Sequence, residues 1–481
     1  MLRLNDTKLL SFPSFIGGKG TGHPDIDVLN PSTGSIVGRV ADLGAEATGA
    51  AIEAASAALP SWRALTAHQR SNFLRAWFDL VVSAREDLAT ILTSEQGKPY
   101  AEALGEIDYA SAYIQFYAEE AKRINGEILP SHRANARIMV LREPVGVVAA
   151  ITPWNFPAAM VTRKLAPALA AGCTTVLKPA LETPLTAMAL VELARRAGLP
   201  DGSINIVTGN AVTIGEVLTS HPAVRMISFT GSTAVGKILM RQASTTVKKV
   251  ALELGGNAPF IVFDDANLDD AADGAILSKF RNMGQTCVCT NRIYVHSSVH
   301  DVFVEKLAAR IETLKVGDGF APGVEQGPLI SLEAIAKIEA HIKDAADQGG
   351  KVVVGGQRHT NGGTFFQPTL ITGMTADMAI AREETFGPVA SIFSFETDEE
   401  VIKAANDTET GLAAYVYARD ASKIFSIMGR LDFGMIGINT GTISTELAPF
   451  GGVKESGNSR EGSHHGILEY TDLKYVCVGI T

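Results

Sequence analysis

The sequence predicts an α/β fold with parallel sheets, and three features of the chain support this. First, apolar runs of strand length alternate with helical stretches, and strands separated by helices form parallel sheets. Second, each early run leads into a turn with proline or glycine, and open parallel sheets bind ligands at the carboxyl ends of their strands. Third, a second α/β rhythm begins near residue 256. The strand candidates are 147–151, 174–177, 204–207 and 225–229, and then 260–263, 292–295 and 391–394.

The composition describes a large globular chain with an acidic balance. Its 481 residues are 46% hydrophobic, which is enough for a large core in two or three domains. A net charge of -10 disfavours nucleic acid and anionic membrane partners. No apolar run reaches the roughly 18 residues of a membrane span, and the N-terminus lacks a signal-peptide pattern. Four cysteines are too few for a disulfide framework, so we expect a cytoplasmic protein.

The turn after the first buried strand candidate, 152–157, holds Asn155 between two prolines. A side-chain amide fixed in this way can donate to a developing oxyanion. The alternative is an ordinary turn residue.

The segment 229–237 predicts a strand, a glycine-bearing turn and the start of a helix. The free N–H groups and positive dipole at such a helix start favour a phosphate. The segment matches neither GxGxxG nor GxxxxGK[ST], so this signal is weak by itself.

Two further residues suggest covalent chemistry. Glu253 lies in an apolar strand-like run that ends in two glycines, where a carboxylate is costly unless it is paired or its pKa is raised. A raised pKa suits a general base, and a salt-bridged glutamate is the alternative. Cys287 follows a Gly-Gln-Thr turn and, as a thiolate, is a strong nucleophile; an inert buried cysteine is the alternative. Cys289 completes no set of zinc ligands, so we expect no metal.

Six motifs, taken together and in this order, make the chain similar to the aldehyde dehydrogenase superfamily over essentially its whole length. Within that superfamily it most resembles the bacterial NADP-type succinate-semialdehyde dehydrogenases. The motifs are TPWNFP at 152–157, FTGST at 229–233, LELGG at 252–256, GQTC at 284–287, EETFGP at 383–388 and PFGG at 449–452.

The resemblance implies an aldehyde dehydrogenase-like fold with two Rossmann-like α/β domains and a β oligomerisation arm. It implies a cofactor-binding domain of 1–126 and 145–255, and a catalytic domain of 256–445. The arm is expected from 127–144 and 463–481, in a homodimer or homotetramer. The strand-like alternation at 137–142 agrees with such an excursion.

By the same similarity Cys287 is the nucleophile, Glu253 the general base and Asn155 an oxyanion donor. The implied reaction adds Cys287 to the aldehyde, transfers hydride to NAD(P)+ and leaves a thioester, which water activated by Glu253 hydrolyses. The residues expected near the cofactor are Trp154, Lys178, Leu181, Gly231, Ser232, Glu384 and Phe386, with Glu384 on the nicotinamide ribose.

The subfamily resemblance implies a small semialdehyde substrate whose distal carboxylate is bound by Arg163, Arg281 and Ser444. A guanidinium suits this role because it holds a carboxylate through two parallel hydrogen bonds. Succinate semialdehyde is therefore the predicted substrate, and the predicted place is in the degradation of γ-aminobutyrate. Glutarate semialdehyde stays an alternative because one methylene is worth only ~1–3 kcal/mol in a pocket. Either arginine could instead pair with an internal carboxylate.

Cofactor choice depends on Leu181. NAD-preferring relatives often carry a glutamate three residues after the lysine that matches Lys178, where it binds both ribose hydroxyls and repels a 2′-phosphate. With Leu181 there, NADP is the preferred expectation, and NAD stays open because Glu182 is adjacent.

Other functions of the same fold were weighed. A CoA-acylating enzyme would pass the acyl group to a thiol, and a catalytically silent protein would be expected to lose Cys287 or Glu253; the presence of both favours hydrolysis. The spacing of Cys287 and Cys289 suggests a regulatory disulfide, as in mammalian relatives, if the loop can adapt. Asn458 and Ser459 replace the Leu-Gly of many relatives, which leaves the local loop geometry open. His464 and His465, without further ligands, suggest a solvated pair.

Overall fold

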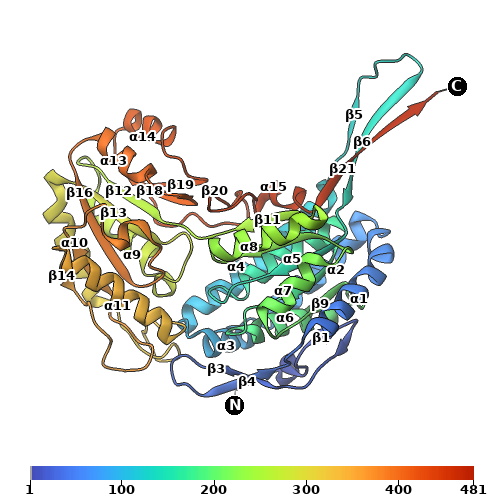
Figure 1. Ribbon diagram of the computed structural model, residues 1–481, viewed down its shortest axis with the longest axis horizontal. Helices are drawn as coiled ribbons and strands as arrows, with labels where there is room; N and C mark the ends of the chain where they lie inside the picture. The colour runs from blue at the N-terminus through green and yellow to red at the C-terminus, as the bar shows by residue number, and fades with distance from the viewer. Residues whose placement is uncertain (1–2, 481) are drawn as a thin grey trace.

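Two seven-stranded sheets organise the chain, in a computed structural model that describes residues 3–480. Figure 1 shows each sheet in its own lobe, with a thin β arm that projects from one of them. Helices lie on the faces of both sheets, as the parallel pairing of most strands requires. This architecture confirms the predicted α/β fold with parallel sheets.

The first sheet is parallel except for a short hairpin at one edge. Its strand order is β11-β10-β7-β8-β9-β1-β2, and β1 runs antiparallel to both β9 and β2. The parallel strands are short and buried on both faces, which explains their continuous apolar runs. The strands are β1 Phe15–Ile16, β2 Lys19–Gly20, β7 Val147–Ile151, β8 Thr174–Lys178, β9 Ile204–Ile206, β10 Val224–Thr230 and β11 Lys249–Glu253.

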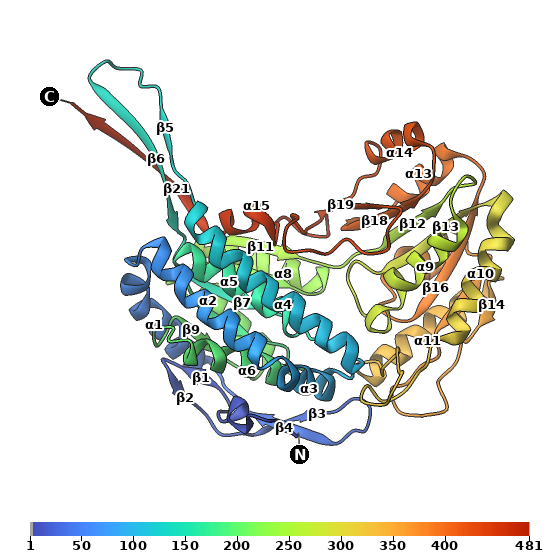
Figure 2. The same cartoon turned by 180° about the vertical axis from the view of Figure 1, so that it is seen from behind.

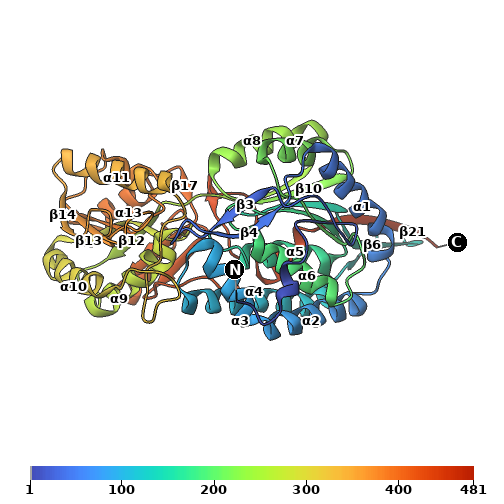
Figure 3. The same ribbon diagram turned by 90° about the horizontal axis from the view of Figure 1, so that it is seen from below.

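The two faces of the first sheet pack into separate apolar cores. In β7, Val147 and Ala149 join the core under α1, α7 and α8, whereas Val148 and Ala150 join the core under α2 to α6. Figure 3 shows these two helical layers on opposite sides of the lobe, and Figure 2 shows α2 and α4 side by side in the second layer. The helices of this lobe are α1 Ala45–Arg63, α2 Ala67–Ser83, α3 Arg85–Gln96, α4 Tyr100–Glu120, α5 Ala159–Ala171, α6 Pro184–Arg196, α7 Ala211–Ser220, α8 Thr233–Ala243 and α15 Ser463–Leu468.

The second sheet repeats this layered design. Its strand order is β14-β15-β16-β13-β12-β18-β19. Within this sheet, as far as residues 3–480 show, β14 alone pairs antiparallel to its neighbour. The strands are β12 Ala258–Val262, β13 Thr290–His296, β14 Lys351–Val354, β15 Thr369–Thr372, β16 Val389–Phe395, β18 Ala413–Tyr417 and β19 Met435–Ile438. The helices are α9 Leu268–Lys279, α10 His300–Thr313, α11 Leu332–Asp347, α12 Ala379–Arg382, α13 Asp398–Asn406 and α14 Ala421–Met428.

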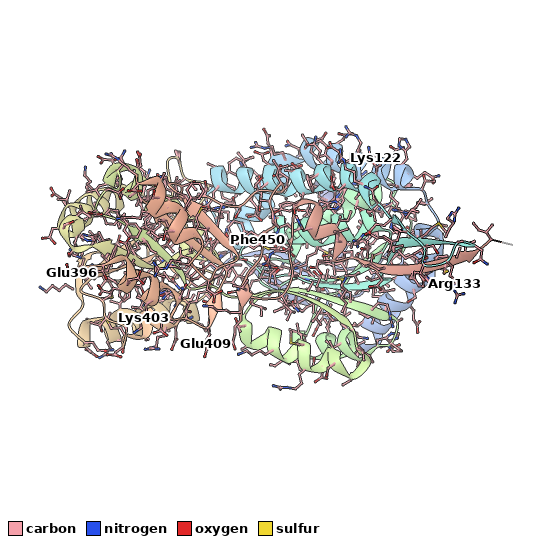
Figure 4. All side chains as sticks on the ribbon, turned by 90° about the horizontal axis from the view of Figure 1, so that it is seen from above. Lys122, Arg133, Glu396, Lys403, Glu409 and Phe450 are labelled. Carbon is pink, nitrogen blue, oxygen red and sulfur yellow. The ribbon has the colours of Figure 1, made fainter. Side chains whose placement is uncertain are left out.

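Three small sheets complete the fold. Two of them are antiparallel two-stranded pairs, β3 Ile26–Leu29 with β4 Ile36–Val40, and β17 Thr410–Gly411 with β20 Val453–Lys454. The third is the projecting arm, in which the C-terminal strand β21 Thr471–Gly479 pairs along β6 Ala136–Pro144, and β5 Glu127–Leu129 pairs on the other side of β6. Arg133, labelled in Figure 4, lies on this arm.

The seven strand candidates of the sequence correspond to β7, β8, β9, β10, β12, β13 and β16. The domain limits given above stay predictions. Within residues 3–480, every helix is too short or too polar to cross a bilayer.

Candidate active site

Two of the predicted reactive residues, Cys287 and Asn155, meet where the two lobes face each other, and Glu253 lies buried behind the cavity wall beside Leu254 and Gly255. The carboxyl ends of β7, β10 and β11 point toward the segments that precede β13 and β16. A cavity of about 290 Å³ lies between them. It is lined by Pro153, Trp154, Asn155, Met160, Thr230, Gly231, Ser232, Leu254, Gly255, Cys287, Lys337, Glu384 and Phe386.

The loop that carries Cys287 has an unusual backbone. Asn282, Met283 and Gly284 all have positive φ, at 51°, 57° and 72°. Non-glycine residues in this region cost free energy, and they persist where the surroundings hold them. Here Gln285 supplies part of that hold, because its side chain donates to the Asn282 carbonyl and accepts from the backbone N–H of Ile330. The turn therefore presents Cys287 in a fixed place at the cavity wall.

The Cys287 thiol is protonated at rest. Burial of the surrounding site, and then the negative charge of Glu384, raise the pKa of Cys287 to about 12, although the side chain itself is partly open to the cavity. A thiol with so high a pKa needs a base that accepts its proton as the sulfur bonds to a substrate.

Asn155 is oriented toward the nucleophile loop. Its side-chain Nδ2 donates to the carbonyl oxygen of Gln285 at 3.1 Å, which fixes the face of the amide and leaves a second N–H free to donate. The side chain is 4% exposed and lies beside Cys287 in the same cavity. The structure thus brings these two predicted residues together.

A buried ion pair supports the turn that holds Asn155. Lys98 and Glu106 pair within the core, and the Lys98 ammonium also donates to the Asn155 carbonyl at 3.0 Å. Glu106 in turn accepts the N–H of Ala158 at 2.9 Å, at the start of α5. Lys98 also lies 3.7 Å above the ring of Phe156. Together these contacts hold the turn in one conformation. An oxyanion donor must be held rigidly in this way to be effective.

Glu253 is a buried carboxyl at the end of β11. It is 3% exposed, and its Oε1 accepts a hydrogen bond from the Ser459 hydroxyl at 2.8 Å. Its Oε2 has no hydrogen-bond partner within residues 3–480. Burial, followed by the charge of Glu461, raises the pKa of Glu253 well above its ordinary range. A carboxyl of this kind is a better proton acceptor near neutral pH than an exposed glutamate.

A second, smaller pocket opens on the other side of Cys287. Its volume is about 20 Å³, which is room for roughly one or two water-sized groups. Arg163, Arg281 and Ser444, the three residues predicted to bind a carboxylate, all line it. The other lining residues are Tyr109, Phe156, Met160, Thr286, Cys287, Val288 and Phe450. Phe450 is labelled in Figure 4, near the middle of the molecule.

Arg163 is a buried cation with unused donors. It is 2% exposed, and its Nη2 lies 2.8 Å from Glu461 Oε2, close enough for an ion pair but out of line for a hydrogen bond. Among the described residues, Nε and Nη2 find no acceptor. Its guanidinium lies 4.0 Å above the Phe450 ring. Arg163 therefore does pair with an internal carboxylate, yet keeps N–H groups for a ligand.

Arg281 is more loosely held. Its guanidinium lies 4.8 Å above the ring of Phe156, and its Nε is 3.9 Å from Glu102 Oε1, which is too long for a hydrogen bond. The side chain is 34% exposed. This arginine is thus positioned by an aromatic ring, and its donors remain available to an anion in the pocket.

The residues predicted to contact a dinucleotide divide into two groups. Trp154, Gly231, Ser232, Glu384 and Phe386 line the larger cavity, and the Trp154 and Phe386 rings meet edge to face at 5.5 Å. Lys178 and Leu181 do not line it. Lys178 is the last residue of β8, which pairs with β7, and Leu181 follows it three residues later in the chain.

The larger cavity has features that suit a nucleotide cofactor. Ser232 caps the start of α8 and lines the cavity, and the free N–H groups of a helix start favour a phosphate. A Cβ on Gly231 would lie 2.4 Å from the Phe229 ring, so the close-fitting turn requires glycine. Glu384 accepts from the Gly256 N–H at 3.3 Å, and burial raises the pKa of Glu384 to about 7. Trp154, Ser232 and Glu384 would hold the cofactor.

Several lining residues were not predicted from the sequence. Lys337 of α11 donates to the Glu384 carbonyl at 2.5 Å and lines the larger cavity. Met160 lines both cavities, beside Cys287. Nothing in the local pattern of α5 or α11 marks these residues, because an apolar or charged residue on a helix face is common. The serine at 459 was noted only as a departure from relatives.

Two other expectations concern residues near the site. Cys287 and Cys289 are both free, and the buried Cys289 sulfur accepts a hydrogen bond from the Lys279 ammonium at 3.3 Å, so a disulfide between them stays a hypothesis. His464 is 50% exposed, and its Nδ1 lies 3.0 Å from a carboxylate oxygen of Glu120.

Comparisons with known proteins agree with these observations. A family model described as the aldehyde dehydrogenase family matches residues 18–476. The chain is 55% identical to the NADP(+) succinate-semialdehyde dehydrogenase GabD of Escherichia coli (strain K12), over 100% of both chains. It is 54% identical to a glutarate-semialdehyde dehydrogenase of Pseudomonas aeruginosa, over 99% of this chain and 100% of that one. A crystal structure of succinate-semialdehyde dehydrogenase from Burkholderia pseudomallei superposes with a TM-score of 0.98 at 55% identity, covering 99% and 100%.

Proposed function

Because this chain belongs to the aldehyde dehydrogenase family, we propose that it oxidises succinate semialdehyde to succinate, with NADP+ preferred and NAD+ as the alternative cofactor. The reaction class follows from the family, and two observations support it: Cys287 and Asn155 line one cavity, and Glu253 is a buried carboxyl directly before Leu254 and Gly255 of the same cavity wall. The degradation of γ-aminobutyrate is the proposed setting.

One observation carries the choice of substrate. The small pocket beside Cys287 places Arg163 and Arg281 together, and Arg163 has N–H donors that no described residue accepts. Unpaired buried donors cost free energy, which an anionic ligand recovers when it binds. An aldehyde with a carboxylate at its far end fits this pocket, and the limited space favours a short chain between the two groups.

The proposed mechanism begins with addition of the Cys287 sulfur to the aldehyde carbon. The thiol proton passes to water in the open cavity as the C–S bond forms, which leaves Glu253 free to act as a base in the later hydrolysis. The oxyanion that forms is stabilised by the free N–H of Asn155 and by the backbone N–H of Cys287. When bound in the larger cavity, the nicotinamide ring supplies the hydride acceptor for the oxidation to a thioester on Cys287.

Hydrolysis of the thioester returns the resting enzyme. Glu253 takes a proton from water, the water oxygen bonds to the thioester carbon, and the C–S bond breaks with its electron pair on the Cys287 sulfur. The sulfur then takes up the proton, and the carboxylic acid leaves. Arg163 and Arg281 hold the distal carboxylate throughout, which keeps the reacting carbon beside the sulfur.

The test of this function is a comparison of aldehydes. Initial rates of NADPH and NADH formation are measured with succinate semialdehyde, glutarate semialdehyde and propanal. We expect succinate semialdehyde to exceed propanal in kcat/KM by roughly a hundredfold or more, because a charge-assisted carboxylate contact is worth about 1.5–3 kcal/mol and two arginines contribute. Equal rates with propanal would overturn the substrate assignment and leave a general aldehyde dehydrogenase.

Glutarate semialdehyde is the second candidate, because the relative from Pseudomonas aeruginosa acts on it. The same pocket would bind its carboxylate, and discrimination against one extra methylene is only about 10- to 200-fold. A higher kcat/KM for this substrate in the same experiment would favour the second candidate.

Cofactor preference is tested at Leu181. Leu181→Glu places a carboxylate near the carboxyl end of β8, where we propose that the adenosine ribose binds. We expect kcat/KM for NADP+ to fall about tenfold or more, because a carboxylate repels a phosphate, while NAD+ is used as well as before or better. Leu181→Gln is the matched control without charge. An equal loss with both cofactors in the glutamate variant would contradict a role for this position in choosing the cofactor.

A dimer or tetramer assembled through the arm is part of the proposal. The edge strands β5 and β21 expose Ile128, Leu473 and Tyr475, and Ile128 is 80% exposed. Unpaired strand edges with large apolar side chains favour pairing with a second copy.

A further inference from the structure

We infer that Ser459 is a positioning residue for the general base: its hydroxyl anchors one oxygen of the Glu253 carboxylate and leaves the other free for the attacking water. This inference rests on the proposed role of Glu253. The contact that carries it is the hydrogen bond from the Ser459 hydroxyl to Glu253 Oε1, at 2.8 Å between two buried side chains.

The segment 456–459 is held against β11 by backbone pairing on both sides of Glu253. Leu254 donates its N–H to the Ser456 carbonyl at 2.9 Å, and Asn458 donates its N–H to the Leu252 carbonyl at 3.2 Å. The Asn458 side chain also accepts the Leu252 N–H at 3.1 Å. A Cβ at Gly457 would lie 1.9 Å from the Leu252 carbonyl oxygen, so only glycine permits this approach. The serine is therefore delivered to the carboxyl by a rigid scaffold.

The hydroxyl has two acceptors within reach and one proton to give. Besides Glu253 Oε1, the Leu252 carbonyl lies 3.3 Å from Ser459 Oγ. When Glu253 is ionised, the hydroxyl donates to Oε1 in a charge-assisted bond. When Glu253 is protonated on Oε1, it can donate to the serine oxygen, whose own proton turns to the Leu252 carbonyl. Both protonation states thus keep a partner, and the carboxyl stays in one position as it titrates.

The two carboxylate oxygens have different environments. Oε1 is anchored by Ser459, whereas Oε2 is buried and has no partner among residues 3–480. Because a buried acceptor without a partner favours a donor, Oε2 is the atom that takes the proton from water in the hydrolysis step. Anchoring Oε1 fixes the direction in which Oε2 faces.

The hydroxyl also opposes the effects that keep Glu253 protonated. Burial and the nearby Glu461 raise the pKa of Glu253, while Ser459, Arg163 and Lys164 lower it. The Cys287 thiol is a further titratable neighbour, and the charge of Glu253 contributes to its raised pKa. Removal of the hydroxyl alone leaves all of these charges in place, so a change in the pKa of Glu253 in such a variant reports on Ser459.

A cofactor-free reaction tests the inference in the full-length protein. A nitrophenyl ester acylates Cys287 without any dinucleotide, and release of the acyl group then depends on Glu253 and water. The deacylation rate is measured between about pH 5.5 and 9 for wild type, Ser459→Ala and Ser459→Thr. In Ser459→Ala we expect the acid limb to move up by about one pH unit, with roughly tenfold slower deacylation below it. Ser459→Thr, which keeps a hydroxyl, should restore the wild-type limb.

The controls separate this role from folding and from the proposed function. Ser14→Ala removes another buried serine hydroxyl, which donates to Ile206 next to the opposite edge of the same sheet, and should leave the acid limb unchanged. The acylation burst should change less than twofold in all serine variants. An unmoved limb in Ser459→Ala, or a loss that is uniform with pH and that threonine does not restore, overturns the inference. Undiminished deacylation in Glu253→Gln would instead overturn the role of Glu253 itself.

Discussion

Glu253→Gln should slow steady-state turnover by about a thousandfold while the first round of hydride transfer survives as a burst. General base catalysis contributes roughly 10²–10⁴ in rate, and an amide at the end of β11 cannot take a proton from water. The Cys287 sulfur and the Asn155 amide remain in place, so the acyl group forms on Cys287 and accumulates.

The measurement is rapid mixing with succinate semialdehyde and NADP+, followed by mass spectrometry of the quenched protein. We expect about one equivalent of NADPH in the burst and a mass increase on the peptide that contains Cys287. Turnover of wild type should fall as the pH drops through the raised pKa of Glu253, because the protonated carboxyl cannot act as a base. The glutamine variant should lose this pH dependence. A variant that turns over at the wild-type rate would remove Glu253 from the mechanism.

Arg281→Ala should lower kcat/KM for succinate semialdehyde by about a hundredfold and leave that for propanal nearly unchanged. Each charge-assisted bond to a carboxylate is worth roughly 1.5–3 kcal/mol, and 1.4 kcal/mol is tenfold. Propanal lacks the carboxylate, so it serves as an internal control for damage to the nucleophile loop. Arg281→Lys should give an intermediate loss, because an ammonium keeps the charge but not the paired donors.

Arg163 is the other half of this test, with a different expectation. Because Arg163 is buried beside Glu461, its removal costs folding stability as well as substrate binding. The loss of stability should stay below the roughly 3–5 kcal/mol of a fully broken buried pair, because Lys164 still pairs with Glu461 at 2.6 Å. Arg281 is partly exposed and forms no close buried ion pair, so its removal should cost little folding stability. The change in kcat/KM of the Arg281 variant therefore reports on substrate binding alone. Arg310→Ala, at a surface arginine paired with Asp273 on α9, is the matched control and should change neither substrate. Equal losses for both aldehydes in Arg281→Ala would contradict the carboxylate clamp.

The inner strands β7 to β10 of the first sheet and β12, β13 and β16 of the second were predictable because their signals are local. The apolar runs that became β7 and β8 are buried on both faces, and such strands read as continuous hydrophobic stretches. Glu253 could also be identified from its neighbours in the sequence, because a carboxylate in an apolar run must be paired or have a shifted pKa. In the structure, the pKa of Glu253 is raised. The turns that contain Cys287 and Asn155 indicated that these residues could be reactive. The resemblance to the family then implied their roles as nucleophile and oxyanion donor.

The contacts of the site were not predictable in this way. Arg163 lies on a helix, and Arg281 in a turn far along the chain, and no local pattern says that they share a pocket with Ser444. Lys178 and Leu181 were expected at the cofactor. They lie at the carboxyl end of β8 in the first sheet, as expected, but they do not line the larger cavity. Lys98 lies just before α4 and Glu106 lies within it, and both support the turn that carries Asn155. No pattern in the local sequence indicates that role.

The sequence by itself determined the α/β fold class and the order of the central strands along the chain, and it pointed to the groups that are proposed to react. Each of these depends on periodicity, on turn residues or on side-chain chemistry within a few residues. Tertiary structure alone decided which groups meet. Packing brought the Ser459 hydroxyl within hydrogen-bond distance of Glu253 and left Arg163 with unused donors beside Glu461. It also placed the small pocket that Arg163, Arg281 and Ser444 line next to Cys287. Those meetings depend on how distant segments pack, and hydrogen-bond geometry over a few ångströms has no signature in the local sequence.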